Sequence, residues 1–294
     1  MDKIRVLSPA KINLDLIVEN KRKDGFHNIS SLMQPINLYD EISIKISSGE
    51  NLIDLIFPEK LVKYEENIIV KAAKSFFNYF KINNKVEISV KKRIPIGSGM
   101  GGGSSNAAAT LIALSKLFNI DEFPALEKIA LELGSDVPFF LYSRTSRVSG
   151  RGEVVKPFSI NEKMKYLLIF PGIESNTKDL YQMWDKEELR NIAKNREDIQ
   201  SHLEKQILIN SNKFILRNDF TPILLSKDKK YLNIFKILRD LNINSYSVSG
   251  TGSTIFCVIN KDSDFVESQK YIESNEDLIT LNVESFEGWH FAFD

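Results

Sequence analysis

The stretch PIGSGMGGGSSNAAATLIAL, residues 95–114, holds five of the chain's 14 glycines within seven positions. A strand pattern, KVEISVKK at residues 85–92, leads into it, and the alanine-rich run that follows predicts a helix over 104–118. Glycines let a backbone adopt positive φ and approach a ligand closely. Successive N–H groups and the first turn of a helix then attract anions. The stretch therefore predicts a phosphate-binding loop between a strand and a helix.

Other types of loop fit these residues poorly. A Walker A loop needs G-x-x-x-x-G-K-[ST], and no lysine stands at the required position. The segment GSGMGG, residues 97–102, matches the G-x-G-x-x-G pattern of dinucleotide-binding folds. That fold also needs an acidic residue about 20 positions later at the end of a strand, whereas Asp121 and Glu122 precede a helical pattern. A flexible linker would not join a strand directly to an apolar helix.

On the N-terminal side of the loop, strand patterns surround one helical pattern. EISIKIS and NLIDLIF, residues 41–47 and 51–57, are separated by SGE and predict a β-hairpin. Apolar residues recur at helical spacing over 68–80, and Asn67 is a suitable N-cap for that helix. The other segments expected here are strands in IRVL and KINLDLIV and a loop in KRKDGFHN.

On the C-terminal side, strands and helices continue without strict alternation. A helix is expected over 123–133, ended by Gly134, and residues 135–155 are expected to form a turn and then strands. Residues 177–208 are strongly charged and predict an exposed helical segment. The remaining expected elements are a strand in MKYLLIFPG, a helix in YLNIFKILRDL, a strand, turn and strand in SYSVSGTGSTIFCVI, a helix in FVESQKYIES and a strand in LITLNVES.

The order of these elements favours an α+β fold over a doubly wound parallel sheet, because strands and helices do not alternate strictly. A chain of 294 residues forms one large domain or two of ordinary size. A weak break in the pattern falls near residues 156–159. We therefore expect two domains, at residues 1–157 and 158–294.

The composition indicates a packed globular protein, with 43% apolar and 27% charged residues. Lys plus Arg and Asp plus Glu number 39 each, so nothing in the net charge favours nucleic acid or an anionic membrane as partner. The single cysteine, Cys257, cannot form an internal disulfide and indicates a reducing compartment. The chain has neither a signal-peptide pattern nor an apolar run of about 20 residues. We expect a cytoplasmic protein without nucleic-acid or membrane partners.

Three motifs together resemble those of the GHMP kinases. PIGSGMGGGSSNAA is similar to their phosphate-binding motif, PAKIN at residues 9–13 to their N-terminal motif, and SGTGSTIF at residues 249–256 to their C-terminal glycine turn. The resemblance implies a ribosomal-protein-S5-like N-terminal domain, a ferredoxin-like C-terminal domain and a site between them. It also implies an ATP-dependent small-molecule kinase that transfers a phosphoryl group to an alcohol, with ATP as co-substrate and Mg²⁺.

Further stretches narrow the resemblance to GHMP kinases whose substrate is a small molecule linked to cytidine diphosphate. These stretches are RKDGFHNISSLMQPI at residues 22–36, LGSDVPFF at 133–140 and GRGE at 150–153. Two alternatives stay open at this point. The chain could be another GHMP kinase, acting on mevalonate, homoserine or a sugar, or a nucleotide-binding protein without catalytic activity.

The resemblance implies roles for three aromatic or imidazole side chains on the substrate side. Phe26 would stack on the cytosine ring, at a position where this family commonly has tyrosine. His27 would bond the edge of the base, since a neutral imidazole can both donate and accept a hydrogen bond. Tyr181 would close the stack from the other side. His202 and His290 receive no role.

The resemblance also implies a catalytic pair, Lys11 and Asp136. Asp136 would act as the base toward the substrate hydroxyl, and an ordinary aspartate is ionised at neutral pH. From the residues alone, an aspartate that caps a turn is an equally good interpretation. Lys11 would pair with Asp136 and stabilise the transferred phosphoryl group, although most strand lysines are simply exposed. Asn13 would hydrogen-bond the substrate alcohol.

For ATP, Asn67 and Lys92 match positions at the nucleotide pocket, and Asn67 serves equally well as a helix cap. Ser105 is a possible contact for Mg²⁺, and no carboxylate ligand can be named. The residues expected to bind the phosphates are Pro95, Ile96, Gly97, Ser98, Gly99, Met100, Gly101, Gly102, Gly103, Ser104 and Ser105 in the glycine loop and Gly250, Thr251, Gly252 and Ser253 in the C-terminal turn.

Overall fold

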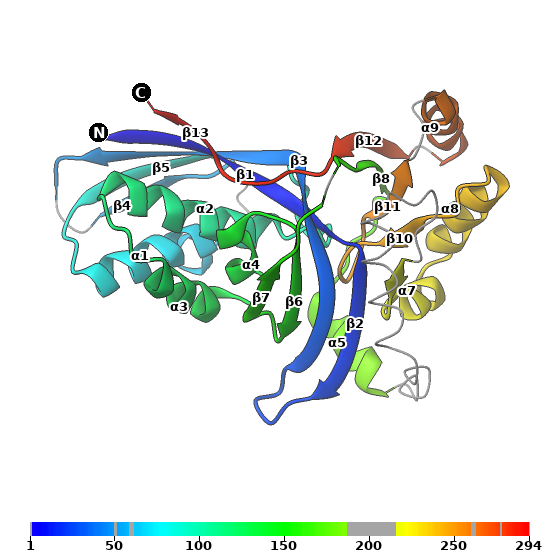
Figure 1. Cartoon of the computed structure of the whole chain (residues 1–294), viewed down its shortest axis with the longest axis horizontal. Helices are drawn as coiled ribbons and strands as arrows, with labels where there is room; N and C mark the ends of the chain where they lie inside the picture. The colour runs from blue at the N-terminus through cyan, green and yellow to red at the C-terminus, as the bar shows by residue number, and fades with distance from the viewer. Residues whose placement is uncertain are drawn as a thin grey trace.

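The computed structural model of the chain describes residues 2–49, 52–58, 62–160, 162–186, 216–259, 263–276 and 278–293. Within these residues, the strands form a nine-stranded sheet and a four-stranded sheet (Figure 1). The larger sheet contains β1 (Lys3–Asn13), β2 (Asp15–Lys21), β3 (His27–Ser47), β4 (Ile53–Ile56), β5 (Lys85–Lys91), β6 (Ser146–Gly150), β7 (Val154–Pro157), β9 (Arg217–Asn218) and β13 (His290–Phe293). The smaller sheet has the order β10 (Tyr246–Val248), β11 (Ile255–Ile259), β8 (Lys165–Phe170) and β12 (Ile279–Glu284).

The helices fall into two groups in space, one beside each sheet (Figure 1). Beside the larger sheet lie α1 (Ile68–Phe80), α2 (Gly102–Leu117), α3 (Phe123–Leu133) and α4 (Val137–Tyr142), with a short 3-10 turn, η1 (Tyr64–Glu66), before α1. Beside the smaller sheet lie α7 (Thr221–Lys227), α8 (Lys229–Asp240) and α9 (Ser263–Glu276). Helix α5 (Thr177–Lys186) lies near the end of β2. The expected α+β class is confirmed.

The long strand β3 organises the larger sheet, because it pairs with β1, β2, β5 and β6 along its length. Its pairing with β1 shifts register between Pro9 and Ala10, immediately before Lys11. Residues 8–13 of β1 are all buried, so this part of the strand is covered on both faces. The PAKIN motif therefore lies deep in the molecule, where the helices of the larger sheet and the C-terminal part of the chain meet.

The expected hairpin between residues 41–47 and 51–57 is wrong. β4 pairs in parallel with β5, which lies between β4 and β3 in the sheet. The connection from β4 to β5 contains helix α1, and parallel neighbours need such a crossover. The sequence pattern showed two strands and a short loop, but it could not show that a third strand comes between them.

Five elements were not expected from the sequence, namely η1, α4, β9, α7 and β13. Residues Val137–Tyr142 form helix α4, where strands were expected, and Pro138 stands in its first turn, a position that favours a helix start. The C-terminal residues His290–Phe293 form β13, which pairs with β1 and covers the edge of the larger sheet. A short helix, α7, precedes α8.

Most of the other helices and strands agree with the sequence patterns. Asn67 caps α1 by accepting a hydrogen bond from the Ile69 N–H at 3.0 Å. Helix α2 covers Gly102–Leu117, against an expectation of 104–118, and α3 has the expected bounds. Of the helical segment expected over 177–208, residues 177–186 form α5, and 187–215 lie outside the described residues.

Two strands that follow residue 157 in the chain belong to the larger sheet, namely β9, which pairs with β2, and β13. The chain thus returns twice to the sheet that its N-terminal half builds. Cys257 is buried on β11. In the part of the chain that the structure describes, no helix has both the length and the apolar character to cross a membrane.

Candidate active site

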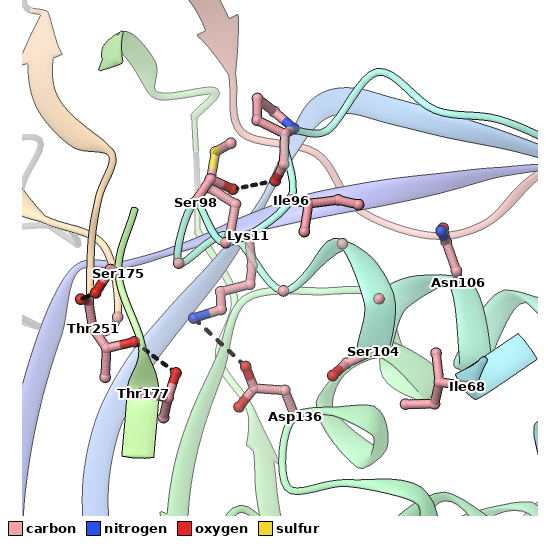
Figure 2. Close-up of a pocket in the computed structure, with 18 of the residues that line it drawn as sticks. Lys11, Ile68, Ile96, Ser98, Ser104, Asn106, Asp136, Ser175, Thr177 and Thr251 are labelled. Atoms are coloured by element: carbon pink, nitrogen blue, oxygen red, sulfur yellow. Dashed lines mark hydrogen bonds and ion pairs between the residues drawn. The ribbon is translucent and has the colours of Figure 1, made fainter. Parts of the chain in front are cut away.

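The glycine loop, the PAKIN strand, the start of α4 and the C-terminal glycine turn surround one cavity of about 510 Å³ (Figure 2). Its walls come from both the larger sheet and the segments near the smaller sheet. Of the site residues expected from the sequence, the cavity is lined by Lys11, Asn13, Asn67, Lys92, Asp136, Tyr181, all loop residues from Pro95 to Ser104, and Gly250, Thr251 and Gly252. The remaining ones, Phe26, His27, Ser105 and Ser253, lie outside its lining, and His202 is not among the described residues.

The glycine loop packs so closely against neighbouring residues that Gly99 and Gly101 have no room for side chains. A Cβ on Gly99 would lie 2.3 Å from the Ser249 carbonyl oxygen, and one on Gly101 would lie 2.8 Å from the Phe140 ring. Both glycines have positive φ, which favours glycine further. The Lys11 N–H donates to the Met100 carbonyl at 3.0 Å, and the Ser249 hydroxyl donates to the Gly99 carbonyl at 3.0 Å. The loop is thus bonded to both the N-terminal strand and the C-terminal turn.

Helix α2 begins at the cavity with its N-terminal N–H groups uncapped by any side chain. Its N-cap is Gly101, in the left-handed conformation, so these donors face the cavity. Figure 2 shows Ser104 on this first turn, on the side where Asp136 lies. Such a helix start attracts phosphate groups through its N–H donors and its dipole.

The structure corrects the expectation for Ser105. Its hydroxyl accepts a hydrogen bond from the Ser8 hydroxyl at 2.7 Å, and the residue is fully buried. Consecutive residues of a helix point about 100° apart, so Ser104 lines the cavity while Ser105 faces β1. Ser105 is therefore a packing contact between α2 and β1, and it lies outside the lining of the cavity.

Lys11 and Asp136, the two residues that the sequence analysis expected to be a catalytic pair, lie next to each other in the wall of the cavity. Lys11 Nζ is 3.7 Å from Asp136 Oδ2, with 4% of the lysine side chain and 30% of the aspartate side chain exposed (Figure 2). Burial lowers the pKa of Lys11, and the charge of Asp136 partly opposes that shift. Lys11 Nζ also donates to the Asn13 side-chain oxygen. In the cavity, the buried ammonium group of Lys11 therefore contacts both the Asp136 carboxylate and the Asn13 amide.

The turn-cap interpretation of Asp136 fails in the structure. Asp136 stands at the N-cap position of α4, but its side chain accepts no capping hydrogen bond. The carboxylate points to Lys11 instead. Ser135, the residue before Asp136, packs closely against Gly152, where a Cβ would lie 2.1 Å from the Ser135 carbonyl oxygen. The conformation of this turn thus presents the carboxylate to the cavity.

A chain of buried polar groups orients Asn13. Its amide nitrogen donates to the Ser31 hydroxyl at 2.7 Å, and that hydroxyl donates to the Asp15 carbonyl oxygen. The Asp15 carboxylate in turn pairs with Arg147 through two contacts of 2.9 and 2.8 Å. Because the amide nitrogen bonds to Ser31, the amide oxygen is directed to Lys11.

The sequence did not reveal Asn106, which lines the end of the cavity beside α1, or Asp40, which lies behind the lining and bonds to Asn106 and Lys92. Asp40 is fully buried and accepts bonds from Lys92 Nζ at 2.6 Å, from the N–H groups of Arg93 and Ile94 at 2.7 and 2.9 Å, and from Asn106 Nδ2 at 2.9 Å. The side-chain oxygen of Asn106 is buried and has no partner among the described residues, although Asn106 lines the cavity. A buried acceptor without a partner is costly, so this oxygen is suited to a ligand donor.

Asn106 had a weak signal in the sequence, as an amide within an otherwise apolar helix just after the serines. Asp40 had none, because its partners are 52 to 66 residues away along the chain. Lys92, which was expected to contact the nucleotide, lines the cavity, and its ammonium group forms an ion pair with Asp40.

Phe26 and Tyr181, which were expected to stack on the two faces of the cytosine ring, do not face each other in the structure. The Tyr181 and His27 rings stack with centroids 5.1 Å apart and 25° between their planes. Phe26 is 48% exposed, and the Arg151 guanidinium lies over its ring at 5.1 Å. No ring contact joins Phe26 to Tyr181, although both residues are described. The structure thus brings His27 and Tyr181 together and leaves Phe26 at the outer surface.

The C-terminal glycine turn is attached to both halves of the site. Asn218 Nδ2 donates to the carbonyl oxygens of Val248 and Gly250 at 2.7 Å each, which ties the turn to β9. The Thr251 hydroxyl bonds to the Thr177 hydroxyl at 2.9 Å at the start of α5 (Figure 2). The turn therefore connects the phosphate end of the cavity to the helix that carries Tyr181.

Comparison with known proteins identifies the class first. The family model described as "GHMP kinases N terminal domain" matches residues 67–144. The solved homoserine kinase of Cytophaga hutchinsonii, 18% identical, shares the fold with a TM-score of 0.79 over 99% of this chain and 98% of that one. The chain is a GHMP kinase, and hence an ATP-dependent small-molecule kinase.

More similar relatives then identify the family. A 4-diphosphocytidyl-2-C-methyl-D-erythritol kinase of Thermodesulfovibrio yellowstonii is 37% identical, over 90% of this chain and 92% of that protein. A crystal structure of 4-(cytidine 5'-diphospho)-2C-methyl-D-erythritol kinase, 25% identical, gives a TM-score of 0.78 over 96% of this chain and 99% of the other. The chain belongs to the 4-diphosphocytidyl-2-C-methyl-D-erythritol kinase family.

Proposed function

We propose that this protein transfers the γ-phosphoryl group of ATP to the 2-hydroxyl of 4-diphosphocytidyl-2-C-methyl-D-erythritol, forming the 2-phosphate and ADP. The reaction is a step of the non-mevalonate route to isoprenoid precursors. The observation that carries the proposal is the Lys11–Asp136 pair, 3.7 Å apart at the wall of a cavity that the glycine loop also lines. The names of the relatives supply the substrate.

In this mechanism the substrate oxygen attacks the γ-phosphorus, and its proton passes to the Asp136 carboxylate. The bond between the γ-phosphorus and the bridging oxygen breaks, and ADP leaves with that oxygen. Lys11 is buried, so its charge acts in a region of low dielectric and stabilises the negative charge on the phosphoryl oxygens. Phosphoryl transfer needs mainly positioning and charge neutralisation, and the pair supplies both.

The ATP phosphates would lie against the N–H groups of the glycine loop and of the first turn of α2. The base would lie toward Asn67, Lys92 and Asn106, where the unpartnered Asn106 oxygen can accept a hydrogen bond. Mg²⁺ would arrive with the phosphates and neutralise their charge. The described residues contain no group of three or more acidic, histidine or cysteine side chains that could hold a metal ion. The site therefore fits an ion that is held chiefly by ATP, with Ser104 and Asp136 nearby.

For the second substrate, Asn13 would bond the alcohol beside Lys11. His27 and Tyr181 would contact the cytosine, and Phe26 at the outer surface could close over it after Arg151 moves from its ring. Residues 1–157 and 158–294 would form the two domains that meet at the cavity, and β9 and β13 of the second would complete the sheet of the first. A cytoplasmic location is supported by the lone cysteine, Cys257.

The test is turnover of the purified protein with ATP, Mg²⁺ and 4-diphosphocytidyl-2-C-methyl-D-erythritol. Mass spectrometry should show one added phosphate, phosphorus NMR should place it on the 2-oxygen, and ADP should form in equal amount. Mevalonate, homoserine and galactose serve as comparison substrates and should give much lower kcat/KM. If folded protein phosphorylates one of these instead, it is a different GHMP kinase. If it binds ATP and phosphorylates nothing, the proposal fails.

A further inference from the structure

The His27 ring is held from two directions by residues of α5. Tyr181 stacks on its face, and His27 Nε2 lies 2.9 Å from Asp185 Oδ1. Only 4% of the His27 side chain is exposed. Asp185 was not among the residues that the sequence singled out. It stands one turn after Tyr181 near the end of the helix, so both side chains reach the same ring.

The chemistry of the pair decides which ring nitrogen carries the proton. Asp185 also bonds to Lys21, and this bond, followed by that to His27, lowers the pKa of the Asp185 carboxyl. An ionised carboxylate can only accept hydrogen bonds, so His27 Nε2 must carry the hydrogen. In a neutral imidazole Nδ1 is then an acceptor. Among the described residues, the hydrogen bond of the His27 ring is the one that Nε2 makes with Asp185, which leaves Nδ1 for a ligand.

We propose that Asp185 is a positioning residue that holds His27 in the tautomer with an acceptor at Nδ1, and that this makes the site select cytosine over uracil. Cytosine offers an amino donor at position 4, whereas uracil has a carbonyl acceptor there. An acceptor at Nδ1 bonds the first and repels the second. The inference rests on the proposed function, because it specifies which base the cytidylyl site admits.

A purely structural role for Asp185 is the competing explanation. The carboxylate joins Lys21 at the end of β2 to His27 at the start of β3, and it ties both to α5. Loss of that tie would weaken substrate binding whichever base the substrate carried. A change in the tautomer of His27 would instead change the preference between cytosine and uracil. The two explanations therefore predict different results for a pair of substrates that differ only in the base.

The experiment compares wild type with Asp185→Asn, whose amide can either accept from Nε2 or donate to it. Steady-state kinetics are measured for the cytidylyl substrate and for its uridylyl analogue. In Asp185→Asn the ratio of the two kcat/KM values should fall about tenfold, the effect of one hydrogen bond. KM for the cytidylyl substrate should rise, and KM for ATP should stay the same.

Two further variants separate the causes. Asp179→Asn removes an exposed carboxylate from the first turn of the same helix and should leave all constants unchanged. Lys21→Met removes the other partner of Asp185 but keeps its contact with His27, so it should preserve the base preference. The tautomer is read directly in the free protein by ¹⁵N NMR of labelled histidine, with the His27 signals assigned by their loss in His27→Asn.

The spectrum should show the hydrogen of His27 on Nε2 in wild type and a mixture of tautomers in Asp185→Asn. An unchanged tautomer and an unchanged base ratio in Asp185→Asn would overturn the proposal, and so would equal loss for both substrates. If wild type phosphorylates neither substrate, the proposed function fails instead. The NMR result, obtained without substrate, still decides whether Asp185 sets the tautomer.

Discussion

Asp136 is the carboxylate nearest to the buried lysine in the cavity, and its removal is the most direct test of the mechanism. In Asp136→Asn, kcat should fall by about 10²–10⁴-fold, because the amide cannot take the proton from the substrate hydroxyl. KM for ATP should change little, since the loop that faces the phosphates is intact. Steady-state kinetics with varied ATP measures both constants.

The matched control is Asp121→Asn, which changes an exposed carboxylate outside the cavity lining and should behave as wild type. Circular dichroism confirms that each variant is folded. An Asp136→Asn enzyme with the wild-type kcat would remove this residue from the mechanism and leave Lys11 as the main charged group.

Lys11 is expected to contribute to catalysis at a cost in stability. Because burial lowers its pKa below the ordinary value of 10.5, the unfolded chain binds the lysine proton more tightly than the folded one. This loss of folding stability is complete at pH values below the pKa of Lys11 in the folded protein. It shrinks as the pH rises from that pKa to 10.5, and above pH 10.5 it is absent. Lys11→Met should therefore unfold with a free energy about 1 kcal/mol higher at neutral pH, while kcat falls by about 10²-fold or more.

Urea denaturation of wild type and Lys11→Met, at pH 7 and again at pH 10, measures this difference. The gain in the variant should be smaller at the higher pH. A variant that is less stable than wild type at both values would show that the contacts of Lys11 with Asp136 and Asn13 outweigh the desolvation of its charge.

At the scale of the element, the N-cap of α1 combines two functions that can be separated. Asn67 accepts from the Ile69 N–H and also lines the cavity. In Asn67→Ala the free energy of unfolding should fall by about 1 kcal/mol, because the helix loses its cap. KM for ATP should rise about tenfold, because the altered helix start and the missing amide both weaken the contact with the nucleotide. Asn67→Asp keeps the cap but not the amide donor, so it should recover the stability and not the KM.

Chemical denaturation and ATP titration of the two variants check this separation. If Asn67→Asp has the wild-type KM for ATP, the cap is the only function of this residue. The result bears on α1 as a whole, because an altered cap would also shift the helix that connects β4 to β5.

The helices and strands also show which structural features a local sequence pattern can predict and which it cannot. The helices α1 and α3 were predicted within a residue because apolar spacing and caps are properties of neighbouring residues. The pairing of β4 was not, because the partner of a strand is chosen by what else can be buried beside it. Helix α4 was missed because six residues, VPFFLY, are too few to show a period.

At the scale of the whole molecule, the C-terminal end stabilises the N-terminal sheet. β13 pairs with β1, and the Trp289 ring nitrogen donates to the Leu141 carbonyl at 3.1 Å. A chain that ends at residue 288 should lose about 2–4 kcal/mol of stability, since an indole and a phenyl ring lose their packing and the edge of β1 is left open. Thermal and urea denaturation measure the loss.

Phe291→Ala in the full chain isolates the ring from the strand pairing and should account for part of the loss. Unchanged stability of the shortened chain would show that β13 only covers the sheet edge. Such a result would also favour a division of the molecule into two independent domains near residue 157.

The sequence alone was enough to indicate the glycine loop, the helix that follows it, the mixed α+β class and the three motifs of a kinase. Each of these depends on the conformational preferences of neighbouring residues or on a short pattern. Only the folded chain decided that Lys11 meets Asp136, that Ser105 turns to Ser8, and that His27 stacks on Tyr181 beside Asp185. Such contacts join residues far apart in the chain, and they are selected by sheet register and burial, which no local stretch of sequence contains.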